Sequence, residues 1–107
     1  MSEKSQSTHS GDLVTDAPEI TLEDLCQACG VTKEQVVTYV SEGIIEPKDP
    51  KGTQWRFSQL SLIQVRRASR IEHDLGLNAA GVALVFDLMA EIKKLNSRLA
   101  HLERENK

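Results

Sequence analysis

The residues best suited to chemistry are two cysteines, Cys26 and Cys29, in the run CQAC. This spacing occurs in structural zinc sites and in thiol–disulfide exchange motifs. A structural zinc needs four ligands, but no second Cys or His pair has a suitable spacing, and the βαβ context of a redox motif is not predicted. With Leu22 and Leu25, the cysteines follow the i, i+3, i+4, i+7 spacing of one helix face. We therefore predict that they pack in the core and that the chain binds no metal or cofactor.

The remaining candidates for catalysis are histidines and carboxylates. His9, His73 and His101 are isolated from one another in the sequence. His73 stands between Glu72 and Asp74, but adjacent residues on a helix point in different directions and cannot converge. The sequence also contains no nucleophile beside a base and no phosphate-binding loop. These features predict that the protein is not an enzyme.

Capping signals predict two short helices near the start of the chain. Thr21 is an N-cap candidate, and Gly30 suits the left-handed residue that ends the first helix. Thr32 caps the second helix, and Thr32-x-x-Gln35 fits the capping box. Two short helices separated by a glycine-containing turn predict a helix-turn-helix.

Residues 44–57 have no helical period and predict a wing. The turn sequence DPKG at positions 49–52 separates two short extended pieces. Trp55 and Phe57 share one side of the second piece. Packing onto the core and an exposed recognition role are both open to these two aromatic residues.

The following segment predicts a central helix that begins after Ser58 and ends at Gly76. Three arginines, Arg66, Arg67 and Arg70, lie on its solvent side. Its wide apolar stripe predicts contacts with several other elements and contains Leu60, Leu62, Ile63, Val65, Ala68, Ile71 and Leu75.

The last helix, capped by Asn78, has the a/d heptad pattern of a coiled coil. Its charged flanking residues do not settle whether paired helices would be parallel or antiparallel. The stripe could also dock on its own domain, but a helix over residues 79–105 is about 40 Å long, which exceeds so small a globule. We therefore predict a homodimer that buries Val85, Leu88, Ile92, Leu95, Leu99 and Leu102.

These signals predict a mainly α protein in three parts. Residues 1–18 form a flexible N-terminal tail, residues 19–78 a winged helix-turn-helix domain, and residues 79–107 a coiled-coil dimerisation helix. No run of apolar residues is long enough to span a membrane, and no secretory signal is visible. We expect a cytoplasmic protein.

Negative charge is concentrated in the predicted helix-turn-helix. Residues 19–49 contain seven acidic residues and two lysines, whereas a nucleic-acid reader needs the opposite sign. If Val36, Val37 and Val40 face the core, the second helix turns its polar residues outward. The expected exposed set on the two helices is Glu23, Asp24, Gln27, Glu34, Thr38, Ser41 and Glu42.

The order of elements resembles regulators of the mercury-resistance (MerR) type without an effector domain. Within that group, residues 20–105 are most similar to a divergent branch, the chaperone-modulator (CbpM-like) proteins. The resemblance is carried by ITLEDLCQACGVTKEQV, SEGIIEP, the W-x-F of Trp55 and Phe57, and RRASRIEHDLGLNAAGVAL.

This resemblance implies an inhibitor or adaptor that binds the J-domain of a DnaJ-like, curved-DNA-binding-protein type co-chaperone and suppresses its cooperation with Hsp70. J-domains engage Hsp70 through a basic helix, and an acidic surface would attract such a helix. The residues predicted to contact this partner are Glu23, Asp24, Glu34, Thr38, Glu42 and Glu46.

Departures from the DNA-binding pattern favour the same interpretation. Regulators of the parent family usually place an arginine and a tyrosine before the position of Tyr39, where this chain has Val37 and Thr38. Valine can neither pair with a phosphate nor bond to guanine. In the wing, GTQW replaces the usual glycine-tyrosine-arginine run, and Arg56 lies one step out of place. DNA binding is therefore expected to be absent.

The alternative is a DNA-binding regulator in which the acidic surface faces away from the duplex. A dimer held by the terminal helix would suit paired half-sites. The phosphate contacts would then come from Arg56, Arg66, Arg67 and Arg70.

Overall fold

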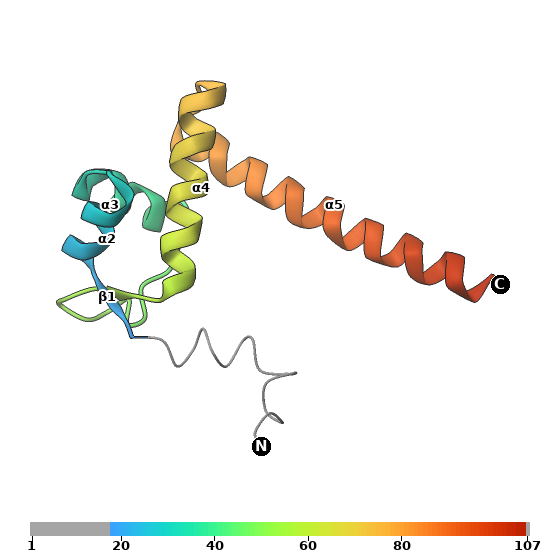
Figure 1. Cartoon of the computed structure of the whole chain (residues 1–107), viewed down its shortest axis with the longest axis horizontal. Coiled ribbons are helices and arrows are strands. Elements are labelled where there is room, and N and C mark those ends of the chain that lie inside the picture. The colour runs from blue at the N-terminus through green and yellow to red at the C-terminus, as the bar shows by residue number, and fades with distance from the viewer. Residues whose placement is uncertain (1–17, 107) are drawn as a thin grey trace, which may run out of the picture.

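The computed structural model describes residues 18–106. The predicted tail, with His9, therefore lies outside the described residues apart from Pro18. The described chain is mainly helical, with a two-stranded sheet (Figure 1). In chain order its elements are β1 (Ile20–Thr21), α2 (Leu22–Cys29), α3 (Lys33–Ser41), β2 (Arg56–Phe57), α4 (Gln59–Leu75) and α5 (Ala79–Glu105).

Side-chain caps define the helix-turn-helix of α2 and α3. The Thr21 hydroxyl accepts a hydrogen bond from the backbone N–H of Asp24 at 3.1 Å. Gly30 ends α2 with a φ of 68°, a left-handed conformation that favours glycine. Thr32 and Gln35 then form a reciprocal capping box at the start of α3. The predicted helix-turn-helix and its caps are confirmed.

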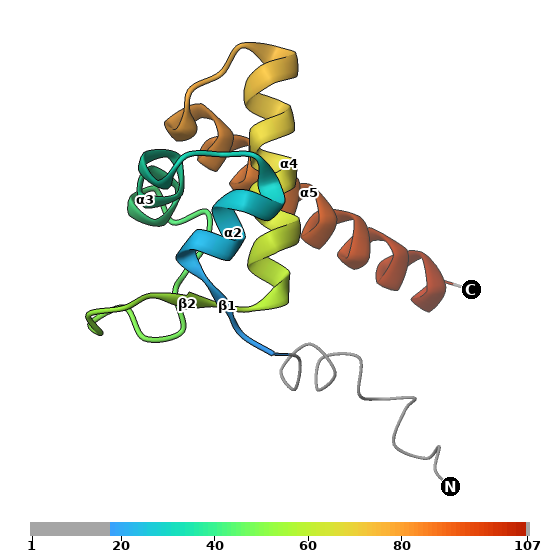
Figure 2. The ribbon, with the colours of Figure 1, turned by 60° about the vertical axis from the view of Figure 1, so that its left-hand side comes forward.

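The wing follows α3 and returns the chain to the sheet (Figure 2). Its predicted turn is present, since the N–H of Gly52 donates to the carbonyl of Asp49 at 3.0 Å. The second extended piece becomes β2, which pairs antiparallel with β1 in the register Ile20 with Phe57. The sequence did not predict β1, because two residues are too few to show an alternating pattern.

Both aromatic residues of the wing pack on the core, which is one of the two possibilities that the sequence left open. Phe57 is fully buried in the core. Trp55 is half-buried and meets Phe57 edge to face, with 6.1 Å between ring centroids. Its indole N–H donates to the Pro50 carbonyl at 3.4 Å, which ties the ring to the wing turn.

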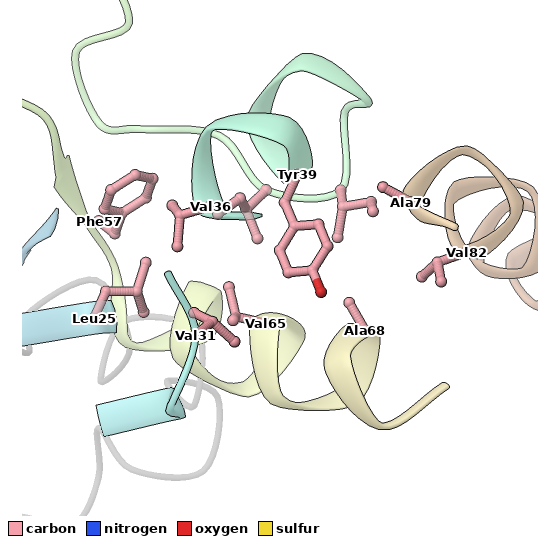
Figure 3. Packing of buried hydrophobic residues seen from close by; sticks show 11 residues of the cluster. Leu25, Val31, Val36, Tyr39, Phe57, Val65, Ala68, Ala79 and Val82 are labelled. Atoms are coloured by element: carbon pink, nitrogen blue, oxygen red, sulfur yellow. The ribbon is translucent and has the colours of Figure 1, made fainter. Parts of the chain in front are cut away.

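The core lies where α2, α3, α4, β2 and the start of α5 meet (Figure 3). Its largest fully buried side chains are Leu25, Val36, Tyr39, Phe57, Val65 and Val82. The hydroxyl of Tyr39 points toward α4 and donates a hydrogen bond to the carboxylate of Glu72. This bond satisfies a phenol that would be costly to bury alone and fixes α3 against α4.

Replacing Tyr39 with Phe is expected to lower the free energy of unfolding by about 1–2 kcal/mol, because Glu72 loses its donor. Burial, followed by the Glu72 carboxylate, raises the pKa of Tyr39. A raised pKa means that the folded state holds this proton more tightly, so the stabilisation is complete below the unfolded pKa of about 10 and is lost as pH rises above it.

Urea unfolding at neutral pH and at about pH 10.5 measures both effects. The wild type should lose more stability between these two pH values than Tyr39→Phe, which has no proton to lose at this position. Equal losses would contradict a role for the Tyr39 hydroxyl.

Several apolar residues predicted to face the core are exposed. Val37 is 44% exposed, because the buried Val36 and Tyr39 set the inward direction of α3 and Val37 points away from it. On α4 the core takes Val65 and Ala68, so the predicted stripe is wider than the face that its neighbours cover. Three further residues of this stripe are therefore exposed instead of packed: Leu60 at 51%, Ile63 at 54% and Leu75 at 64%.

Helix α5 packs on the core only through its first turns and then leaves the globule (Figure 1). Ala79 and Val82 are buried, and Val85 is half-buried. The last five residues of the predicted stripe are between 51% and 56% exposed: Leu88, Ile92, Leu95, Leu99 and Leu102. This exposure rules out the alternative that the stripe docks on its own domain.

No single helix within residues 18–106 has the length and apolar character needed to cross a membrane. The consecutive helices α4 and α5 meet those criteria only as a pair, and the chain bends by 111° between them.

Candidate functional site

The outer face of α3 is the candidate site, defined here as the exposed residues Glu34, Val37, Thr38, Ser41 and Glu42. They follow the i, i+3, i+4, i+7, i+8 spacing of one helical surface. This face carries three of the six residues predicted to contact a partner. It also carries Val37, which sequence reasoning placed in the core.

Two hydroxyl groups on this face bond to their own helix. The Thr38 hydroxyl donates to the Glu34 carbonyl at 2.9 Å, and the Ser41 hydroxyl donates to the Thr38 carbonyl at 2.8 Å. Because each hydroxyl has only one proton to donate, neither is available as a donor to a partner. The remaining polar groups of the face are its two carboxylates, which accept hydrogen bonds and attract cations.

A hollow of about 210 Å³ borders this face at the junction of α3, α4 and α5. Two carboxylates line this hollow, those of Glu34 and Glu72, and Glu72 accepts the hydrogen bond from Tyr39. Sequence reasoning missed Glu72 as part of the acidic surface, since 33 positions separate it from Tyr39 and no local pattern joins them. The hollow is lined by Glu34, Gln35, Thr38, Tyr39, Glu72 and Ala79.

The other predicted contact residues lie elsewhere on the domain. Glu23 and Asp24 are exposed in the first turn of α2. Glu23 borders a separate hollow of about 290 Å³ beside the wing, together with Lys33 and Arg56. Glu46 is exposed in the segment between α3 and β2. The predicted acidic set is thus spread over the winged helix-turn-helix domain, and only the α3 members share one face.

The acidic residues of the site have no cationic partner within the described chain. Both salt bridges found in residues 18–106 lie on α5, between Glu91 and Lys94 at 3.8 Å and between His101 and Glu105 at 3.1 Å. Neither uses a carboxylate of the helix-turn-helix. The negative charge of the outer face therefore remains directed at solvent.

Two exposed arginines of α4 make contacts with other parts of the same domain. Arg66 donates to the Ala28 carbonyl at 3.3 Å, near the end of α2. The guanidinium of Arg67 lies 5.3 Å from the centroid of the Phe86 ring on α5, within range of a cation–π interaction. These contacts orient two of the four arginines that the alternative DNA-binding interpretation requires.

The cysteines behave as core residues. Cys26 and Cys29 are free, half-buried and packed against the core cluster, which confirms the packing prediction. The Cys29 thiol lies 3.7 Å from the Leu62 carbonyl. Burial raises the pKa of both thiols, which disfavours the thiolate that redox chemistry and metal binding require. Within residues 18–106, no cluster of three His, Cys, Asp or Glu side chains is placed to hold a metal ion.

Comparison with known proteins agrees with this geometry. Residues 20–104 match the family described as MerR HTH family regulatory protein, which defines the class of the fold. The chain is also 33% identical over 87 residues to two bacterial relatives, each named chaperone modulatory protein CbpM, from Escherichia coli O139:H28 (strain E24377A / ETEC) and Shigella boydii serotype 18 (strain CDC 3083-94 / BS512). The alignment covers 81% of this chain and 79% of each relative. The chain therefore belongs to the CbpM family, a divergent branch of the MerR-like helix-turn-helix proteins.

Proposed function

We propose that this protein is a cytoplasmic modulator of a DnaJ-like co-chaperone, and that it inhibits the co-chaperone by binding its J-domain. The single observation that carries the proposal is the acidic outer face of α3, whose carboxylates have no salt-bridge partner within residues 18–106. In the parent fold this helix approaches a polyanion, which the charge of Glu34 and Glu42 would repel. The same charge attracts a basic polypeptide and accelerates its association.

Occlusion is sufficient to explain inhibition. A J-domain whose basic helix is covered by the helix-turn-helix cannot present that helix to Hsp70. The mechanism needs no covalent step and no cofactor. The proposed contact residues are three members of the outer face, Glu34, Thr38 and Glu42, and three acidic residues elsewhere on the domain, Glu23, Asp24 and Glu46.

We also propose a division of labour between the two parts of the chain. Residues 19–78 bind the partner, and the helix that begins at Ala79 joins two chains. The exposed stripe on α5 has the a/d spacing of a coiled-coil seam. A homodimer would present two outer faces and could hold two J-domains.

A competition assay tests the proposal. The chain is titrated against the purified J-domain, and the J-domain-stimulated ATPase of Hsp70 is then measured with and without the chain. We expect direct binding that weakens as salt is added, and inhibition that is relieved as the Hsp70 concentration rises. Inhibition that does not change with Hsp70 concentration would contradict occlusion.

Fluorescence anisotropy with duplex DNA tests the alternative, a transcriptional regulator. Arg70 and Arg56 are exposed and would supply phosphate contacts. Low-micromolar DNA binding that falls steeply with salt, combined with no binding to the J-domain, would replace the proposed function with this one.

A further inference from the structure

The centre of the outer face of α3 is apolar. Val37 is 44% exposed, whereas its neighbour Val36 is fully buried. The Thr38 hydroxyl is turned back onto the helix backbone, which leaves the methyl group of Thr38 able to join Val37 in apolar contacts. Glu34 and Glu42 lie toward the two ends of the face, eight positions apart. The face therefore has an apolar centre between two carboxylates.

We propose that Val37 is the apolar anchor of the partner contact, and that the partner is a cationic helix with an apolar residue between two Lys or Arg residues. This inference rests on the proposed function and specifies its partner surface. Eight positions on α3 correspond to about 12 Å. Two cations seven or eight positions apart on a second helix share one face at about the same separation, so each can meet one carboxylate.

This arrangement matches the usual anatomy of a protein interface, in which apolar residues occupy the desolvated centre and charges occupy the rim. The two kinds of residue then control different rates. Rim carboxylates steer encounter and mainly set the association rate. An apolar anchor acts after encounter and mainly sets the dissociation rate.

The test compares Val37→Ala and Val37→Lys with matched variants of Ile63, which is 54% exposed on α4, outside the outer face. Each variant is bound to the purified J-domain of the DnaJ-like co-chaperone from the same organism, and both rates are measured by biolayer interferometry. Val37→Ala is expected to raise the dissociation rate about 3- to 10-fold and to change the association rate less than about twofold. Val37→Lys is expected to weaken binding about 10- to 100-fold, and Ile63→Ala and Ile63→Lys are expected to bind as the wild type does.

Circular dichroism and thermal unfolding confirm that each variant is folded before it is used. If the wild type binds and Val37→Ala dissociates at the wild-type rate, Val37 is not the anchor, while the proposed function stands. If the Ile63 variants weaken binding as much as the Val37 variants do, the inferred position of the contact is wrong. If the wild type does not bind the J-domain, the proposed function fails and the inference fails with it.

Discussion

Replacing Leu95 and Leu99 with aspartate is expected to convert a dimer of this chain into a monomer. Both side chains lie on the exposed stripe of α5, at 51% and 55% exposure, where no other part of the described chain covers them. Burying a leucine side chain is worth about 1.5–3 kcal/mol, and two chains supply four such residues from these positions alone. Aspartates would remove this gain and place like charges in an apolar seam, which strongly opposes association.

We expect the separated chains to stay folded. Both residues are already exposed in the single chain and lie beyond the part of α5 that packs on the core. Light scattering coupled to size-exclusion chromatography gives the measurement. The wild type should have twice the chain mass of 11.9 kDa, and the double variant should have the mass of one chain.

A matched control places the same two aspartates off the stripe, as Ser97→Asp and Ala100→Asp. These positions are exposed on the same turns of α5 but outside the a/d pattern, so the control should remain a dimer. A wild type with the mass of a single chain at tens of micromolar would contradict self-association and leave the stripe to a different partner.

Local signals predicted the helix boundaries well, because capping depends on residues within one turn. The Thr21, Thr32 and Asn78 caps all form as the sequence indicates. The side of each helix that faces the core was harder to predict from the sequence, since it depends on which neighbours cover the helix. Val37 and Ile63 look like core residues in the sequence but are exposed in the structure.

The candidate site was likewise predicted only where local spacing was sufficient. The acidic residues of α3 could be placed together from helical spacing alone. Glu72 could not, because its position beside Tyr39 depends on how α4 packs against α3. Val37 was missed for a related reason: a valine within a run of apolar residues gives no local sign that it faces solvent.

The largest expected effect on partner binding comes from reversing the two carboxylates of the outer face. Glu34→Lys combined with Glu42→Lys should weaken J-domain binding about 10- to 100-fold, mainly by slowing association, because the face would then repel a basic helix. The free energy of unfolding should change by less than about 0.5 kcal/mol, since exposed charges away from ion pairs contribute little. The helix ends support this expectation, because a lysine is unfavourable in the first turn of α3 but favourable at its C-cap, so the two effects offset.

The control must change the net charge by the same amount without touching the site. Asp74→Lys with Asp87→Lys meets this condition, since both aspartates are exposed and lie on α4 and α5. Binding that weakens equally in both double variants would mean that the overall charge of the protein, and not the outer face of α3, attracts the partner. Binding that weakens only in the Glu34 and Glu42 variant, with a shallower salt dependence than the wild type, is the expected result, because the attraction that salt screens in the wild type would be replaced by repulsion.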